Sequence, residues 1–161
     1  MDNLLLTDEI IFELKPDAVP YNYRISYKLS QLCLIIGYNT TGNVGCSLVK
    51  LHILSSAFNA ESYMKLLNNY LNGTSANMIV RFDSAVNRGV KYAFAEELIY
   101  QLKNGTFRLT EKGEQFISKI NAEADLLLKE KEYLSTLGKK LTNKKIENLM
   151  SIWRYKNAKT K

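Results

Sequence analysis

Few residues of this chain could carry catalytic chemistry, and their positions do not combine into a known type of site. His52 is the only histidine among the 161 residues, so linked-histidine metal sites are excluded and a catalytic triad would depend on this one side chain. It lies in the most apolar segment, where a core or boundary histidine is expected more often than a general base. Glu96 and Glu97 would point about 100° apart on a helix, which is unfavourable for sharing a metal or a proton. We therefore expect a protein that is not an enzyme and holds no cofactor or metal.

Two cysteines and a glycine-bearing loop also lack the pattern that their chemistry would require. Cys33 and Cys46 have neither zinc-site spacing nor the clustered arrangement of a disulfide framework. The segment from Gly37 to Gly45 follows a predicted helix instead of a strand, and it lacks the lysine and hydroxyl pair of a P-loop. We expect both cysteines to be buried small hydrophobes in a protein of the reducing cytosol, with no nucleotide at that loop.

Side chains able to contact nucleic acid gather around one predicted helix. They are Arg81, Asn87, Arg88, Lys91 and Arg108. These residue types contact phosphates and base edges, so the set could serve a DNA-binding helix and the strand beside it. The same helix face continues into two glutamates, which would repel phosphates. A solvated or protein-docking face is therefore the preferred interpretation, and DNA contact is the alternative.

The positive charge of the chain is concentrated at its C-terminal end. The formal net charge is +6, yet residues 139–161 hold eight of the 22 lysine and arginine residues and a single carboxylate, Glu147. The remaining residues are nearly neutral, with 14 basic and 15 acidic side chains. Any attraction to nucleic acid or to an acidic partner must therefore depend mainly on the tail.

Hydrophobic periodicity predicts helices through the first half of the chain. Apolar residues at helical spacing predict a first helix that Gly37 ends, with Lys28 and Gln31 on its polar side. Residues 48–58 are apolar on nearly every side, which indicates a central helix covered by others. Asn59 is the expected N-cap of a third helix, which ends near residue 73.

The following segment predicts a small β element between two helices. Residues 78–82 are β-prone, and a fourth helix follows that extends from Ser84 to Leu102. Residues 106–109 form a short strand, after which Thr110 caps a long helix. In that helix a glycine at position 113 permits close approach to a neighbour. This order of elements is typical of a winged-helix domain.

The chain is therefore predicted to be mostly α with a small β-wing, an α+β winged-helix domain followed by a C-terminal helical extension. An acidic arm spans residues 1–21, the winged-helix domain spans 22–120, and a helical hairpin with a basic tail spans 121–161. Four apolar residues of the last helix lie at i, i+3, i+4 and i+7, and they are Ile146, Leu149, Met150 and Trp153. Lysines flank this stripe, so it suits a helix that docks in a partner's groove with an acidic rim.

Three stretches resemble a known family. The run from Gly105 to Gly113 resembles the wing strand and following helix start of winged-helix proteins. Together with the tripeptide at residues 23–25 and the run at 80–98, it resembles the middle component of ABC-three-component bacterial defence systems of the Lamassu type. That resemblance covers roughly residues 20–120. It implies an accessory subunit that binds an SMC-like ATPase and an effector nuclease, with DNA contacted through the complex.

These observations favour an adaptor protein, with a winged-helix DNA-binding transcriptional regulator as the alternative. No apolar stretch approaches the roughly 20 residues that are needed to span a bilayer. Asp2, Asp8 and Glu9 stand where a secretory signal would need positive charge. We therefore expect no membrane partner and a cytoplasmic location.

Overall fold

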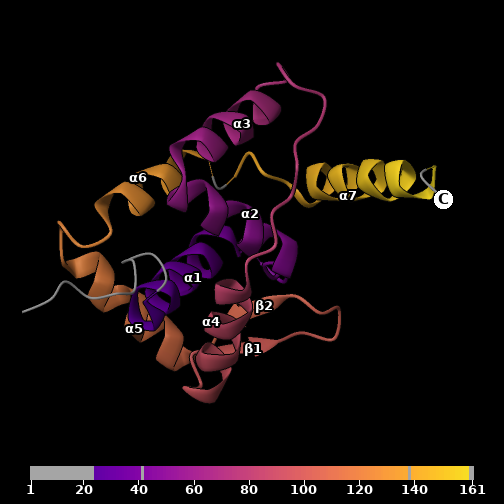
Figure 1. Ribbon diagram of the computed structural model, residues 1–161. Helices are drawn as coiled ribbons and strands as arrows, with labels where there is room; N and C mark the ends of the chain where they lie inside the picture. The colour runs from indigo at the N-terminus through magenta and orange to yellow at the C-terminus, as the bar shows by residue number, and fades with distance from the viewer. Residues whose placement is uncertain (1–23, 41, 138, 160–161) are drawn as a thin grey trace, which may run out of the picture.

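The described part of the chain folds mainly into helices, with a two-stranded antiparallel sheet at the side of the body (Figure 1). The computed structural model describes residues 24–40, 42–137 and 139–159, so the predicted acidic arm at 1–21 lies outside the described residues. The elements are α1 (Ile25–Asn39), α2 (Leu48–Asn59), α3 (Glu61–Leu71), α4 (Ser84–Ala95), β1 (Ile99–Gln101), β2 (Phe107–Leu109), α5 (Glu111–Ala122), α6 (Leu128–Leu137) and α7 (Asn143–Ala158). None of the helices in this part of the chain has the length and apolar character that crossing a membrane would require.

Helix α1 lies at the centre of the body, in contact with α2, α4, α5, α6 and β2. Leu32 and the four residues after it are almost completely buried. The prediction that Lys28 and Gln31 form a polar, solvated side of this helix is wrong, because their side chains are 1% and 0% exposed. Helices from distant parts of the sequence cover the side of α1 that the hydrophobic pattern of α1 assigns to solvent.

A buried hydrogen-bond network makes this enclosure possible. The Lys28 ammonium donates to Ser55 Oγ at 2.8 Å and to Gln31 Oε1 at 3.1 Å. The amide nitrogen of Gln31 donates to the hydroxyl of Tyr27 at 3.0 Å, and that hydroxyl donates to a carboxylate oxygen of Glu130 on α6. Since buried polar groups are costly unless they are hydrogen-bonded, the network joins α1, α2 and α6 into one structure.

The sequence pattern predicts that Gly37 ends α1, but in the structure Gly37 lies inside this helix. The helix continues to Asn39, and a β-carbon at position 37 would stand 2.5 Å from Ile117 Cδ1 and 3.2 Å from Leu109 Cδ1. The glycine therefore marks the place where α5 and β2 cross α1 closely. Asn59, the expected N-cap of α3, is instead the last residue of α2, and Ala60 occupies the cap position.

The sheet uses a strand that the sequence pattern placed in a helix. Helix α4 ends at Ala95 instead of continuing to Leu102, because Glu97 adopts a left-handed backbone conformation with φ of 56°. The next residues form β1, which pairs antiparallel with the predicted strand β2, with Ile99 opposite Leu109. The β-prone residues 78–82 form no strand.

The predicted long helix after Thr110 is divided into α5 and α6. Leu127 has a φ of 52°, which interrupts the helix, and Lys131 donates from its ammonium to the carbonyls of Ile120 and Glu123 at the end of α5. Helix α6 packs against α1, whereas α7 projects away from the body (Figure 1). The two helices of the expected 121–161 hairpin therefore do not lie side by side.

Close approach at Gly113 is confirmed, and it generates a stability prediction. A β-carbon at Gly113 would overlap the backbone carbonyl of Leu98, whereas one at Gly37 would meet the movable end of Ile117. Both glycines are helical, so alanine brings the same propensity gain of about 1 kcal/mol at each. We expect Gly113→Ala to lower the free energy of unfolding by about 2 kcal/mol more than Gly37→Ala, because overpacking against backbone is not relieved. Urea unfolding measures this difference, and equal effects would contradict the packing.

Candidate interaction surfaces

The groups with catalytic potential do not form a catalytic or metal-binding cluster among the described residues. No group of three or more histidine, cysteine, aspartate or glutamate side chains is close enough there to hold a metal ion. Cys33 and Cys46 are free and buried, and burial raises the pKa of each thiol to about 12. A thiol is nucleophilic as the thiolate, and at this pKa both cysteines are protonated thiols at neutral pH.

His52 is buried in α2 and has polar partners on both sides of its ring. Its Nδ1 accepts a hydrogen bond from the backbone N–H of Asp83 at 3.0 Å, so the neutral ring carries its proton on Nε2. Nε2 lies 3.3 Å from Oδ1 of Asn87, and the ring meets Phe82 edge to face. Burial lowers the pKa of His52, and the ring connects α2 to the start of α4 in its neutral form.

Three of the five predicted DNA-contact residues have side chains that contact other residues of the body. Asn87 faces His52, the Arg81 guanidinium lies 5.2 Å from the centre of the Tyr63 ring, and Arg108 donates to the carbonyl of Gly42 at 2.6 Å. These three side chains therefore already have contacts within the body.

Arg88 and Lys91 remain as the free cations of the set. Both are exposed on α4, and neither forms a hydrogen bond or an ion pair within the part of the chain that the structure describes. Tyr92, which sequence reasoning did not select, is 53% exposed next to Lys91. The outer face of α4 thus offers two cations and an aromatic ring, directly before the β1–β2 hairpin.

The predicted docking stripe of α7 is also divided. Ile146 and Leu149 are buried within this chain, so they anchor α7 and are not available to a partner. Met150 is half-buried, and Trp153, further along the helix, is 51% exposed. Helix α7 itself projects from the body (Figure 1). Tyr155, which the apolar stripe does not include, is 64% exposed. Residues 150–158 thus form the free end of α7.

The start of α7 is fixed to α3 by hydrogen bonds. The Tyr70 hydroxyl donates to the backbone carbonyl of Lys145 at 2.8 Å, and the Lys145 ammonium lies 3.4 Å from the carbonyl of Leu71. Thr142 caps the helix by accepting from the Lys145 N–H. These contacts set the direction in which the free end of α7 leaves the body.

The chain matches no protein-family model, and comparison with the curated proteins and with the solved structures likewise finds no match. Function is therefore inferred from the geometry of the two surfaces and from the motif resemblance.

The buried His52 generates a prediction about pH and stability. Its folded pKa is lower than that of the unfolded chain, about 6.5, so the unfolded state binds the proton first as pH falls. The stability associated with neutral His52 is complete above pH 6.5 and is lost below it, by up to about 1.4 kcal/mol per pH unit. Urea unfolding between pH 5 and 7.5 measures the loss. His52→Gln should remove this dependence, and an unchanged slope in that variant would refute the assignment.

Proposed function

We propose that this protein is a non-catalytic adaptor subunit that docks on larger partners through the free end of α7. The observation that carries the proposal is the exposure of Trp153 and Tyr155 on the free end of α7, beyond the buried Ile146 and Leu149. Large aromatic side chains dominate the energetics of protein interfaces when they are buried there, and their exposure leaves that burial energy for a partner.

The charges around these aromatic rings select the kind of partner. Arg154 is exposed between the two rings, and the Lys159 ammonium lies 4.7 Å from the centre of the Tyr155 ring. A groove that accepts Trp153 and has a carboxylate-rich rim would complement both the apolar and the charged parts of this helix.

The motif resemblance supplies the partner classes of the proposal. The body is interpreted as a winged-helix domain, in which α4 is the helix before the wing and β1–β2 is the wing. We assign the chain to the middle component of a Lamassu-type defence complex, where it bridges an SMC-like ABC ATPase and an effector nuclease in the cytoplasm. The buried, neutral His52 and the protonated thiols support a role without catalysis.

The adaptor proposal predicts that the two exposed aromatics are needed for assembly. Trp153→Ala with Tyr155→Ala should abolish co-purification of an SMC-like ATPase and a nuclease from the native host, as identified by mass spectrometry. The thermal midpoint should not change, because neither ring is part of the core. Asn157→Ala, on the same exposed helix, is the matched control. Full recovery of both partners by the double aromatic variant would overturn the docking role of α7.

A second function, DNA-binding regulation, is favoured by Arg88 and Lys91, which are exposed and free on the helix before the hairpin. If that helix enters a major groove, these two cations meet phosphates or base edges. Release of counterions from the contacted phosphates makes such binding strongly dependent on salt.

The regulator alternative predicts salt-dependent binding of duplex DNA by the isolated protein. Arg88→Ala with Lys91→Ala should weaken the affinity for duplex DNA. It should also reduce the slope of the logarithm of the binding constant against the logarithm of the salt concentration, by about one for each phosphate that the variant no longer neutralises. Lys119→Ala with Lys129→Ala removes the same charge from exposed positions on α5 and α6 and should have a smaller effect. If binding instead disappears only when residues 150–161 are deleted, α4 is not the DNA-reading helix.

A further inference from the structure

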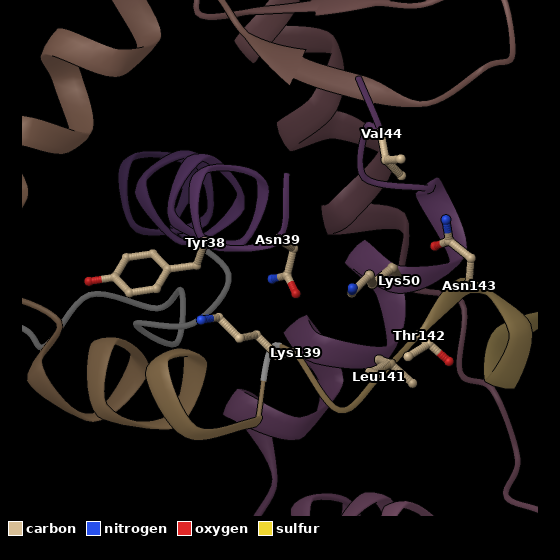
Figure 2. A pocket seen from close by; sticks show the side chains of 8 residues that line it. All are labelled: Tyr38, Asn39, Val44, Lys50, Lys139, Leu141, Thr142 and Asn143. Carbon is tan, nitrogen blue, oxygen red and sulfur yellow. The ribbon is translucent and has the colours of Figure 1, made fainter. Parts of the chain in front are cut away.

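A hollow of about 220 Å³ lies where the end of α1, the first turn of α2 and the start of α7 meet (Figure 2). The polar side chains that line it come from these three helices and from the segment before α7. They are Tyr38, Asn39, Lys50, Lys139, Thr142 and Asn143. Among the residues that the structure describes, two lysines and no carboxylate line the hollow, which favours an anion.

Lys50 is the unusual member of this group. Its side chain extends from α2 into the hollow, and the residue is only 6% exposed (Figure 2). Among the described residues its ammonium forms neither a hydrogen bond nor an ion pair. Burial also lowers the pKa of this amine. The ammonium itself is not one of the fully buried polar atoms that lack a partner among the described residues, so it faces the solvent of the hollow, whereas the Lys28 ammonium has two protein acceptors.

Asn39 contributes a second unsatisfied group on the opposite wall. Its Nδ2 donates to the carbonyl of Ile35 at 2.8 Å, which fixes the orientation of the amide. Oδ1 is buried and has no hydrogen-bond partner. Figure 2 shows the Asn39 amide and the Lys50 ammonium directed into the same hollow from α1 and α2. Within the part of the chain that the structure describes, the site therefore offers the Lys50 ammonium no acceptor and the Asn39 amide oxygen no donor.

The start of α7 adds to the preference for an anion. Thr142 and Asn143 line the hollow at the point where the helix begins, and only one of the first amide groups is capped by the Thr142 hydroxyl. The free amides at a helix N-terminus carry a partial positive charge and favour phosphate groups.

We propose that this hollow binds a small phosphate monoester that also carries a free hydroxyl group. The phosphate oxygens accept from Lys50 near the first turn of α7, Lys139 adds positive charge to the wall of the hollow, and the ligand hydroxyl donates to Oδ1 of Asn39. An ionised carboxylate would satisfy the ammonium groups but could not donate to the amide oxygen. The site is separate from the outer face of α4 and from the free end of α7, so it does not rest on the proposed adaptor function.

Ribose 5-phosphate is the test ligand, and ribose and inorganic phosphate are its comparison compounds. Calorimetric titration of the full chain should show saturable binding of ribose 5-phosphate, weaker binding of inorganic phosphate and no binding of ribose. Lys50→Met should weaken the affinity for ribose 5-phosphate by at least about tenfold, because it removes charge-assisted hydrogen bonds to the phosphate. Lys140→Ala, an exposed neighbour outside the hollow, removes one charge as well and should bind normally.

The unliganded stability separates a binding role of Lys50 from a structural one. If the role of Lys50 is to bind a ligand, Lys50→Met should raise the thermal midpoint of the unliganded protein. The same variant should abolish the increase in thermal midpoint that ribose 5-phosphate causes in the natural sequence. Asn39→Asp is a second test variant. The carboxylate that it introduces should pair with the Lys50 ammonium and repel the phosphate of the ligand.

Three results would overturn the proposal. The first is that ribose 5-phosphate neither binds nor stabilises the natural sequence. The second is a Lys50→Met protein that is less stable and retains full affinity for ribose 5-phosphate. The third is loss of duplex DNA binding in Lys50→Met without any binding of ribose 5-phosphate, which would make the hollow a contact for the DNA backbone.

Discussion

The fold depends on the satisfaction of polar groups buried around α1. Lys28 and Gln31 lie inside the body, and an unpaired ammonium or amide there would cost several kcal/mol. Ser55 from α2 and Glu130 from α6 supply the required partners, directly or through Tyr27. Tyr27 of α1 and Glu130 of α6 are 103 positions apart in the chain, and the network holds their helices in one register by directional bonds, which apolar packing alone does not provide.

The sequence predicts the elements of this fold better than their limits. The apolar helix at 48–59, the strand at 107–109 and the close approach at Gly113 all follow from local pattern, and the structure confirms them. The failures have long-range causes. Gly37 continues a helix because α5 packs against it there, and β1 forms because residues that suit a helix find a pairing strand after the turn at Glu97.

The candidate surfaces show the same division between local and distant information. Helical spacing correctly gathers Arg88 and Lys91 on the outer face of α4, but it cannot show that Arg108 is held by the carbonyl of Gly42. The stripe in α7 mixes residues that the body buries with residues that it leaves exposed, because spacing does not reveal where the body ends. The sequence does not indicate that Lys50 is buried at a hollow, since a lysine within an apolar helix is normally expected to reach solvent.

The attachment of α7 has a mechanical consequence. The helix has 16 residues and is about 24 Å long, and its first turns are bonded to α3 and buried by Ile146 and Leu149. A stiff rod clamped at one end acts as a lever, so a partner that moves the free tip of α7 applies torque to its clamped base. The hollow around Lys50 lies beside that base, because Thr142 and Asn143 belong both to its lining and to the start of the helix.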